Sequence, residues 1–212
     1  MKNEIFYDVS LFGEMDIYLF KEGTHAKLYE HLGSHKLIRD GLDGVYFSTW
    51  APNANSVSVR GDFNDYHESS HALQKRDDDS GIWECFIVGV QEGETYKYHI
   101  ASDAPNANED KSDPYAFYGE VAPSSASRVW SLDGYEWNDK TWMKSRHKNN
   151  SHKEAISIYE VHLGSWRRHV EEGGRFLTYK ESARQLAIYL TEMNFTHVEL
   201  MPITEFPFEG SW

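Results

Sequence analysis

Tyr66 and Lys97 together offer the two groups that binding a sugar requires, an aromatic face and a hydrogen-bond donor. Tyr66 directly follows the turn residues 61–65, and Lys97 lies between two tyrosines in the run 96–98. An exposed ring can cover the C–H surface of a sugar, and an ammonium group can reach its hydroxyls. We therefore predict that both residues bind a glycan. The alternative, that Tyr66 caps a turn and Lys97 lies on a solvated sheet face, carries equal weight.

Four glutamates could supply the paired carboxylates of glycoside chemistry. Glu160 and Glu199 lie within two predicted parallel strands. Active sites of parallel barrels assemble beyond the carboxyl ends of the strands, so we interpret both as structural residues that satisfy buried polar groups. Glu205 and Glu209 follow the second strand, and we interpret them as solvated loop charges. We assign no catalytic residue.

The histidines do not predict a metal site, and no cofactor is expected. His67 and His71 lie in a polar loop, while His162 and His169 flank a glycine turn. Neither pair has the convergent ligands and the outer shell of partners that a metal site needs. We interpret His162 as a hydrogen-bonding residue, with contact to a substrate as the alternative.

Charge and cysteine content limit the partners and the compartment. The 212 residues carry a formal net charge of −13, so the field of the molecule repels nucleic acid and suits a neutral polysaccharide. Cys85 is the single cysteine, and the acidic N-terminus lacks the order of a signal peptide. No apolar run is long enough to span a bilayer. We expect a cytoplasmic protein with neither membrane nor nucleic-acid partners.

Short β-branched and aromatic runs dominate residues 41–130 and predict an antiparallel sandwich. The four clearest strands are residues 45–50, 57–60, 82–88 and 96–100. Their regular spacing, with turn residues between them, is typical of an immunoglobulin-like β-sandwich. Trp50 and Trp83 lie in these strands and are predicted to fill the core. Apolar residues at helical spacing between Ser10 and Gly33 predict two short helices in an N-terminal extension, residues 1–40.

The C-terminal part changes to a strand–helix–strand pattern. Residues 131–154 are polar and charged, and we predict a linker there. Beyond it, residues 155–162 and 196–201 predict strands, and a capping box of Thr178 and Glu181 predicts the start of a helix that runs to residue 193. This order is that of a β-α-β unit. Because a closed (β/α)8 barrel needs about 250 residues, we predict that residues 155–212 are the start of an incomplete barrel in a truncated chain.

Stretches along nearly the whole chain carry a family resemblance. They are residues 16–23, 50–54, 61–64, 96–98 and 111–116, and most specifically 158–166 and 197–205. In these stretches the chain resembles the N-terminal part of the glycogen branching enzymes, which are 1,4-α-glucan branching enzymes of the α-amylase superfamily. The last two stretches are similar to the first and second barrel strands of that family.

The resemblance implies a mainly β fold, an early-set β-sandwich of glycan-binding type followed by the first β-α-β of a (β/α)8 barrel. It implies a retaining transfer that cleaves an α-1,4 bond and moves the chain to a 6-hydroxyl, carried out by carboxylates beyond Trp212. The implied partner is α-glucan, as in glycogen or amylose-like chains. The full-length enzyme is expected to be a monomer, and this chain alone is expected to bind glucan at most.

Two alternatives remain open. The chain could be a stand-alone glycogen-binding or regulatory module, although such a module has no use for the β-α-β tail. It could also belong to a related debranching or trehalose-releasing hydrolase, but residues 16–20 and 164–166 favour branching. Related glycan-binding sandwiches often carry tryptophan where this chain has Tyr66, so we expect weaker stacking here, and the sandwich could instead brace the barrel.

Overall fold

The structure is a computed structural model that describes residues 3–67, 71–103, 109–121, 123–149 and 152–204. The chain forms two compact units, Met1–Tyr135 and Glu136–Trp212. The boundary between them lies within residues 131–154, which also contain helix α2 (Lys140–Asn149). Within the described ranges, every helix is too short or too polar to cross a membrane.

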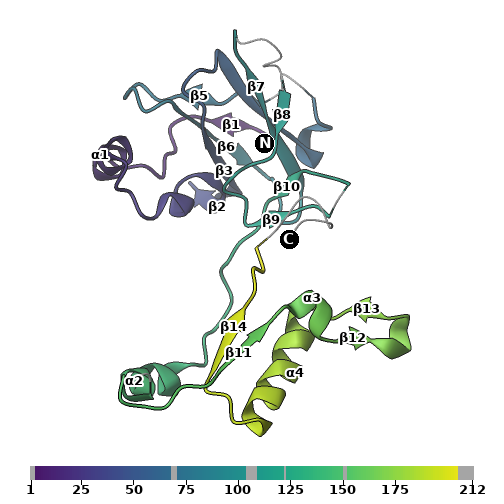
Figure 1. The fold of residues 1–212 in the computed structure, drawn as a ribbon. Helices are drawn as coiled ribbons and strands as arrows, with labels where there is room; N and C mark the ends of the chain where they lie inside the picture. The colour runs from purple at the N-terminus through teal and green to yellow at the C-terminus, as the bar shows by residue number, and fades with distance from the viewer. Residues whose placement is uncertain (1–2, 68–70, 104–108, 122, 150–151, 205–212) are drawn as a thin grey trace. The chain divides into compact units, whose positions relative to one another are not determined.

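The first unit contains two five-stranded antiparallel sheets (Figure 1). The first sheet comprises β1 (Ile5–Phe6), β2 (Gly33–Arg39), β3 (Leu42–Trp50), β5 (Gln74–Lys75) and β6 (Ile82–Val88), in the order β1-β6-β3-β2 with β5 paired to β6. The second sheet comprises β4 (Ser56–Gly61), β7 (Thr95–Ala101), β8 (Glu109–Lys111), β9 (Tyr118–Gly119) and β10 (Ser127–Arg128), in the order β4-β7-β10-β9 with β8 paired to β7. The predicted sandwich is confirmed.

Alternate residues of the two sheets fill one apolar core. Its members include Val45, Phe47, Val57, Val59, Trp83, Cys85, Ile87, Tyr96 and Tyr98. Because successive side chains of a strand point to opposite faces, the residues between these members point to the outer faces of the sandwich. Burial of each large apolar side chain stabilises the fold by roughly 1.5–3 kcal/mol.

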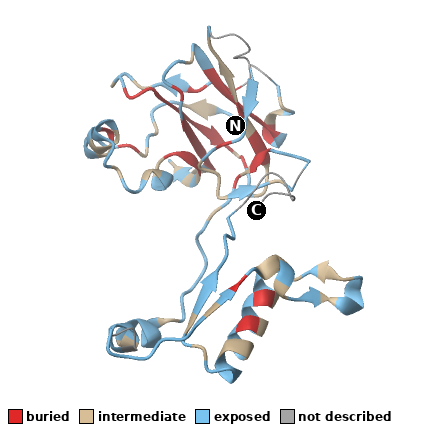
Figure 2. Ribbon diagram, viewed as in Figure 1, coloured by how far each residue is buried: buried red, intermediate tan, exposed pale blue. Residues whose placement is uncertain are grey.

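The outer faces of the two sheets differ in burial, because β6 of the first sheet is buried along its whole length whereas β7 of the second sheet is only partly buried (Figure 2). The outer face of the first sheet is apolar, because Tyr46 and Phe86 pack against residues of the N-terminal segment. Helix α1 (Glu14–Glu22) adds Ile17 to a second small cluster there, beside Ile82. By contrast, the outer face of the second sheet carries the polar residues of β7 that alternate with its core tyrosines. A polar ligand can therefore approach the second sheet directly.

Only one of the two short helices predicted before the sandwich is an α-helix. Helix α1 is the first, whereas the second is a single 3-10 turn, Leu28–Glu30. The chain cannot continue as a helix because Gly33, at φ 102°, begins β2 and pairs with Ser48 of β3. Residues 1–40 therefore contribute strands β1 and β2 to the first sheet as well as a helix.

The second unit is built around two parallel strands joined by a helix. Strands β11 (Ile158–Val161) and β14 (His197–Leu200) pair in parallel, and α4 (Tyr179–Glu192) connects them. Thr178 accepts a hydrogen bond from the Glu181 N–H at 3.3 Å, and the Glu181 carboxylate accepts one from the Thr178 N–H at 2.8 Å. The predicted strand–helix–strand order and its capping box are confirmed.

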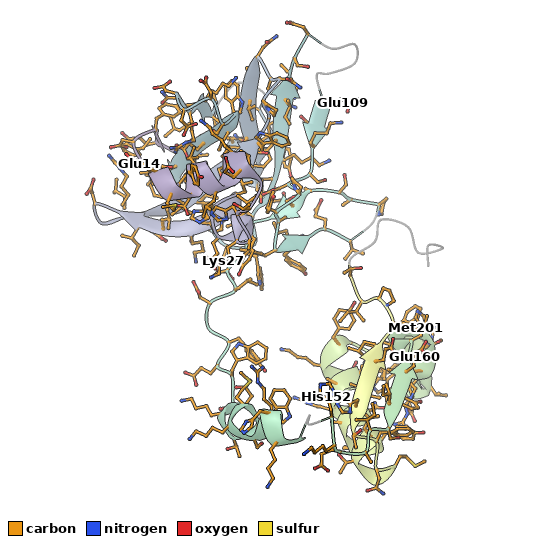
Figure 3. The ribbon with its side chains drawn as sticks, turned by 60° about the vertical axis from the view of Figure 1, so that its left-hand side comes forward. Glu14, Lys27, Glu109, His152, Glu160 and Met201 are labelled. Carbon is orange, nitrogen blue, oxygen red and sulfur yellow. The ribbon has the colours of Figure 1, made fainter. Side chains whose placement is uncertain are left out.

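Smaller elements complete the second unit. They are α3 (Leu163–Trp166) and the hairpin of β12 (Arg168–His169) and β13 (Arg175–Phe176), which a 3-10 turn, Val170–Glu172, connects. Figure 3 labels Glu160 on β11 and Met201 just after β14. The Arg175 guanidinium donates to both oxygens of the Glu181 carboxylate at 3.0 Å, which ties the hairpin to the first turn of α4 and lowers the pKa of the Glu181 carboxyl well below its usual range.

Candidate functional site

The backbone after β4 presents Tyr66 in an uncommon conformation. A 3-10 turn, Asp62–Asn64, follows β4, and then Asp65 and Tyr66 both adopt left-handed φ values of 51° and 56°. The Tyr66 N–H donates to the Gly61 carbonyl at 3.0 Å, which closes the turn. A non-glycine residue in this region costs roughly 1–2 kcal/mol, and such strain often marks a functional position.

The hydroxyl of Tyr66 is anchored on strand β7. It forms a hydrogen bond of 2.6 Å with the Thr95 hydroxyl, and the Thr95 N–H donates to an Asp62 carboxylate oxygen at 2.7 Å. Burial is the largest cause that raises the pKa of the Tyr66 hydroxyl, while the bond to Thr95 opposes it. The ring is half-buried. The turn and the strand therefore fix a neutral tyrosine at the edge of the outer face of the second sheet.

Lys97 lies on the same outer face as the anchor of Tyr66. Thr95 and Lys97 are two residues apart on β7, so their side chains point to the same side, whereas Tyr96 and Tyr98 point into the core. The Lys97 ammonium donates to the Ser125 hydroxyl at 2.9 Å. The structure thus brings the two residues predicted to bind glycan to one face. Their role in binding stays a prediction.

Next to Lys97, a buried arginine adds a second positive group. Arg60 stands directly opposite Lys97 in the pairing of β4 with β7. Arg60 is only 7% exposed, and its guanidinium donates to the Asp110 carboxylate of β8, with a shortest N–O distance of 2.9 Å. Glu109, labelled in Figure 3, marks the start of β8 beside β7. The Asp110 carboxylate therefore holds the Arg60 side chain in place beside Lys97.

A second group of side chains on this face escapes prediction from the sequence. Arg128 of β10 stands opposite Thr95, and Tyr118 of β9 stands opposite Arg128. The Tyr118 ring lies 5.0 Å, centroid to centroid, from the Trp130 ring, and both residues are exposed, at 47% and 40%. The Arg128 guanidinium carbon lies 5.9 Å from the Tyr118 ring centroid. These rings form a second exposed aromatic surface.

This outer face has the chemistry of a binding site for neutral polyhydroxyl compounds. It offers aromatic rings at two places, Tyr66 and the Tyr118–Trp130 pair, and nitrogen donors from Lys97 and Arg128. Rings that cover C–H surfaces and donors that reach hydroxyls are the two requirements of sugar recognition. Two carboxylates near this face, those of Asp62 and Asp110, accept hydrogen bonds from the Thr95 N–H and from the Arg60 guanidinium.

Comparisons with known proteins match residues 31–116 to a carbohydrate-binding family. Residues 31–116 match the model of carbohydrate-binding module 48, the isoamylase N-terminal domain. Over 203 residues the chain is 52% identical to a 1,4-alpha-glucan branching enzyme GlgB from Aquifex aeolicus, covering 96% of this chain and 32% of the relative. Over 197 residues it is 54% identical to GlgB from Albidiferax ferrireducens, covering 93% of this chain and 30% of the relative.

The chain belongs with the N-terminal part of the GlgB branching enzymes. It spans about a third of the length of these GlgB relatives. A crystal structure of a protein provisionally named an alpha amylase, from Salmonella typhimurium, matches with a TM-score of 0.61 at 24% identity, over 85% of this chain and 26% of that one. That likeness supports the fold alone. The matched module 48 region includes Tyr66 and Lys97, whereas Tyr118 and Trp130 lie beyond it.

The two strand tryptophans of this GlgB-related sandwich differ in burial. Trp83 is 8% exposed and its indole N–H donates to the Ala51 carbonyl at 2.9 Å, so its predicted place in the core is confirmed. The same prediction is wrong for Trp50, which is 56% exposed. Trp50 ends β3 and points to the outer face of the first sheet, where Phe20 of α1 lies edge-on to it with ring centroids 6.1 Å apart and the Trp50 indole N–H donates to the Ser80 carbonyl at 3.0 Å.

The carboxylates considered in the second unit do not form a buried pair. Glu160 and Glu199 stand opposite each other in the pairing of β11 with β14, and both are exposed. The interpretation that they satisfy buried polar groups is therefore wrong, because the face of this two-stranded sheet that carries Glu160 and Glu199 is open to solvent. Glu205 and Glu209 lie outside the described residues.

The histidines considered in the sequence have hydrogen-bonding roles. His162 forms a hydrogen bond of 2.8 Å with the Ser165 hydroxyl, in agreement with its interpretation. His71 is 5% exposed and contacts the Asn64 side chain at 2.9 Å and the Asn3 carbonyl at 3.0 Å. Its two ring nitrogens are thus engaged within the sandwich.

Proposed function

We propose that the β-sandwich binds α-1,4-glucan through the outer face of its second sheet, as the carbohydrate-binding part of a 1,4-α-glucan branching enzyme. One observation carries the proposal. Tyr66 is locked to Thr95, and Lys97 projects from the same face two residues further along β7. The match of residues 31–116 to module 48 supports a sugar as the ligand.

Within this proposal each group has a defined task. The Tyr66 ring covers the apolar face of one glucose unit, and the Lys97 ammonium exchanges its bond to the Ser125 hydroxyl for a bond to a sugar hydroxyl. The Tyr118–Trp130 pair offers a further platform on the same sheet, which suits a ligand longer than one sugar. A linear glucan chain meets this requirement better than a monosaccharide.

For the whole enzyme we propose the branching reaction, in which an α-1,4 bond is cleaved and the released chain is joined to a 6-hydroxyl. Retaining chemistry of this kind needs a carboxylate nucleophile and a second carboxyl that acts first as acid and then as base. No residue of this chain is assigned to either role. The parallel strands β11 and β14 with α4 between them support residues 155–212 as the first β-α-β of the catalytic barrel.

The remaining features of the proposal concern location and association. The net charge of −13 and the single, buried Cys85 support a cytoplasmic enzyme that acts on glycogen rather than on nucleic acid or membranes. We propose that the full-length enzyme is a monomer. Size-exclusion chromatography with light scattering tests this, and a dimer mass would contradict it.

Affinity electrophoresis in a gel that contains glycogen tests glucan binding. The chain should be retarded, and Lys97→Ala should weaken binding at least ~10-fold, since a hydrogen bond to a charged group contributes about 1.5–3 kcal/mol. Tyr66→Ala should also weaken binding, because it removes the ring that covers the sugar. Tyr18→Ala and Lys36→Ala are the matched controls, because they remove the same residue types from α1 and from β2 of the first sheet. Unretarded migration of the wild-type chain would contradict the proposal and leave the sandwich as a brace for the barrel.

A further inference from the structure

Three potential metal ligands meet on the segment that covers the first sheet. Asp16 lies in α1, His25 follows the end of that helix, and His31 follows the 3-10 turn. An Asp16 carboxylate oxygen, Oδ1, lies 3.2 Å from His25 Nε2 and 3.6 Å from His31 Nε2. One donor atom from each residue lies within 4.8 Å of the other two. Figure 3 labels Glu14 and Lys27 as landmarks on this segment.

The two measured separations match the edge of a small coordination tetrahedron. Zinc binds histidine nitrogen at ~2.0–2.1 Å and carboxylate oxygen at ~2.0–2.2 Å, so tetrahedral donors stand ~3.3–3.5 Å apart. The values of 3.2 Å and 3.6 Å from Asp16 to the two histidines bracket this distance. The donor atoms of the two histidines lie within 4.8 Å of each other, so the rings would move closer around an ion bound against all three atoms.

Neighbouring backbone groups orient two of the three ligands. His31 Nδ1 lies 2.7 Å from the Leu11 carbonyl, which can only accept, so Nδ1 donates there and Nε2 is the ring nitrogen that faces Asp16. The other oxygen of Asp16 accepts the Gly13 N–H at 2.9 Å, which leaves Oδ1 facing the histidines. Such outer partners fix the tautomer and direction of metal ligands.

The contact between His31 and Asp16 needs a cation. With Nδ1 protonated, a neutral His31 turns a lone pair on Nε2 toward a carboxylate oxygen 3.6 Å away, and two acceptors at that distance repel each other. A second proton on His31 or a metal ion between the groups would remove the repulsion.

The surroundings allow an ion to enter and to be held. The side chains of His25, His31 and Asp16 are 6%, 16% and 29% exposed. The His31 ring packs against the Phe12 ring at 5.0 Å, and Phe12 belongs to the small apolar cluster under α1. His25 Nδ1 accepts the Lys27 N–H at 3.2 Å. Binding of an ion through Nε2 would move the His25 proton to Nδ1 and release that N–H to water.

We propose that Asp16, His25 and His31 form a binding site for a divalent transition-metal ion of the zinc type, with water in a fourth position. Two imidazoles and one carboxylate favour zinc, cobalt or nickel over magnesium or calcium, which prefer more oxygen ligands. The ion would link α1 to the segment that leads into β2, and so fasten the N-terminal cover of the first sheet.

Cobalt titration of the full chain, first freed of metal by a chelator, tests the site. We expect visible absorption bands of four-coordinate Co²⁺ that saturate at one ion per chain and disappear when Zn²⁺ is added. We also expect Zn²⁺ to raise the Tm. His25→Gln and His31→Gln should each weaken Co²⁺ binding at least ~10-fold, since even outer partners of a metal ligand contribute ~10–100-fold.

His147→Gln, on α2 in the second unit, is the control and should leave Co²⁺ binding unchanged. Circular dichroism of the metal-free variants checks that each one folds, and either histidine variant alone suffices for the test. Absence of the Co²⁺ bands and of the Tm shift would overturn the proposal and leave a protonated Asp–His–His cluster. Binding that persists unchanged in both histidine variants would equally overturn it, because the ion would then lie elsewhere.

Discussion

Replacing Asp113 by asparagine is expected to remove a pH dependence from the folding of the sandwich. Asp113 is 6% exposed, and its carboxylate accepts the Tyr96 hydroxyl at 2.5 Å and the Tyr115 N–H at 2.8 Å. Burial is the largest cause of its shift and raises the pKa of the Asp113 carboxyl from 3.8 to about 6, against the opposing effect of these hydrogen bonds. The folded chain thus holds this proton more tightly than the unfolded chain does.

The sign and size of the effect follow from proton linkage. A pKa raised in the folded state gives stability that is complete below about pH 4 and is lost as the pH rises past about 6. A difference of about two pH units corresponds to a loss of ~3 kcal/mol in the free energy of unfolding. An asparagine does not titrate, so the stability of Asp113→Asn relative to wild type should rise by up to ~3 kcal/mol from about pH 4 to about pH 7.

Urea unfolding followed by the NMR signals of the β7 amides measures this difference for the sandwich separately from residues 136–212. Asp77→Asn, in an exposed turn of the same unit, is the control and should keep a constant stability difference from wild type. The reasoning is refuted if the difference between Asp113→Asn and wild type is also constant across this pH range, since Asp113 would then titrate at its ordinary pKa.

Three further predictions concern the core, the second unit and activity. Trp83→Ala should destabilise the sandwich by about 3–5 kcal/mol, because it empties a buried site. Trp50→Ala, at an exposed position, should destabilise it by no more than about 1 kcal/mol. Equal losses in the free energy of unfolding, measured with urea, would contradict the assigned burial. Amide hydrogen exchange should be faster after about residue 150 than in the sandwich, since Ile158 and Val198 of the short parallel sheet are 52% and 41% exposed. Equal protection of the amides in both regions would refute this prediction. The chain alone should leave the iodine stain of amylose unchanged, and any change in absorbance would show transferase activity that it is expected to lack.

The longer strands are predictable from the sequence because each has its own pattern. Strand β6 has the predicted bounds, and β3, β4 and β7 differ from prediction by a few residues at most. Strands β1, β5, β9 and β10 have two residues each, which is too few for an alternating pattern, and pairing with distant strands creates them. The prediction of a second helix, where the structure has a 3-10 turn, is wrong because the spacing of nearby apolar residues carries no information about the pairing of β2 with β3.

The candidate binding face is predictable only in part. Tyr66 and Lys97 stand beside recognisable turn and strand residues, so their types and positions could be interpreted before the structure was known. Thr95, Arg128 and Tyr118 come together only through the register of β7, β10 and β9, which the sequence of a loop-rich stretch does not reveal.

The cluster of Asp16, His25 and His31 has a similar origin. The three residues do not follow a helical period, and no pair of them resembles a metal-binding motif. They meet because the chain reverses after α1 at Gly23, which has a left-handed φ of 70°.

Titration of the full chain with maltoheptaose, followed in ¹H–¹⁵N NMR spectra, tests the central claim most directly. A glucan bound on the outer face of the second sheet should shift the amides of the Tyr66 turn, of Thr95 and Lys97, and of β9 and β10, while the amides of α1 stay in place. Spectra that do not change, or shifts confined to α1 and the first sheet, would contradict the claim that this face is the glucan-binding site.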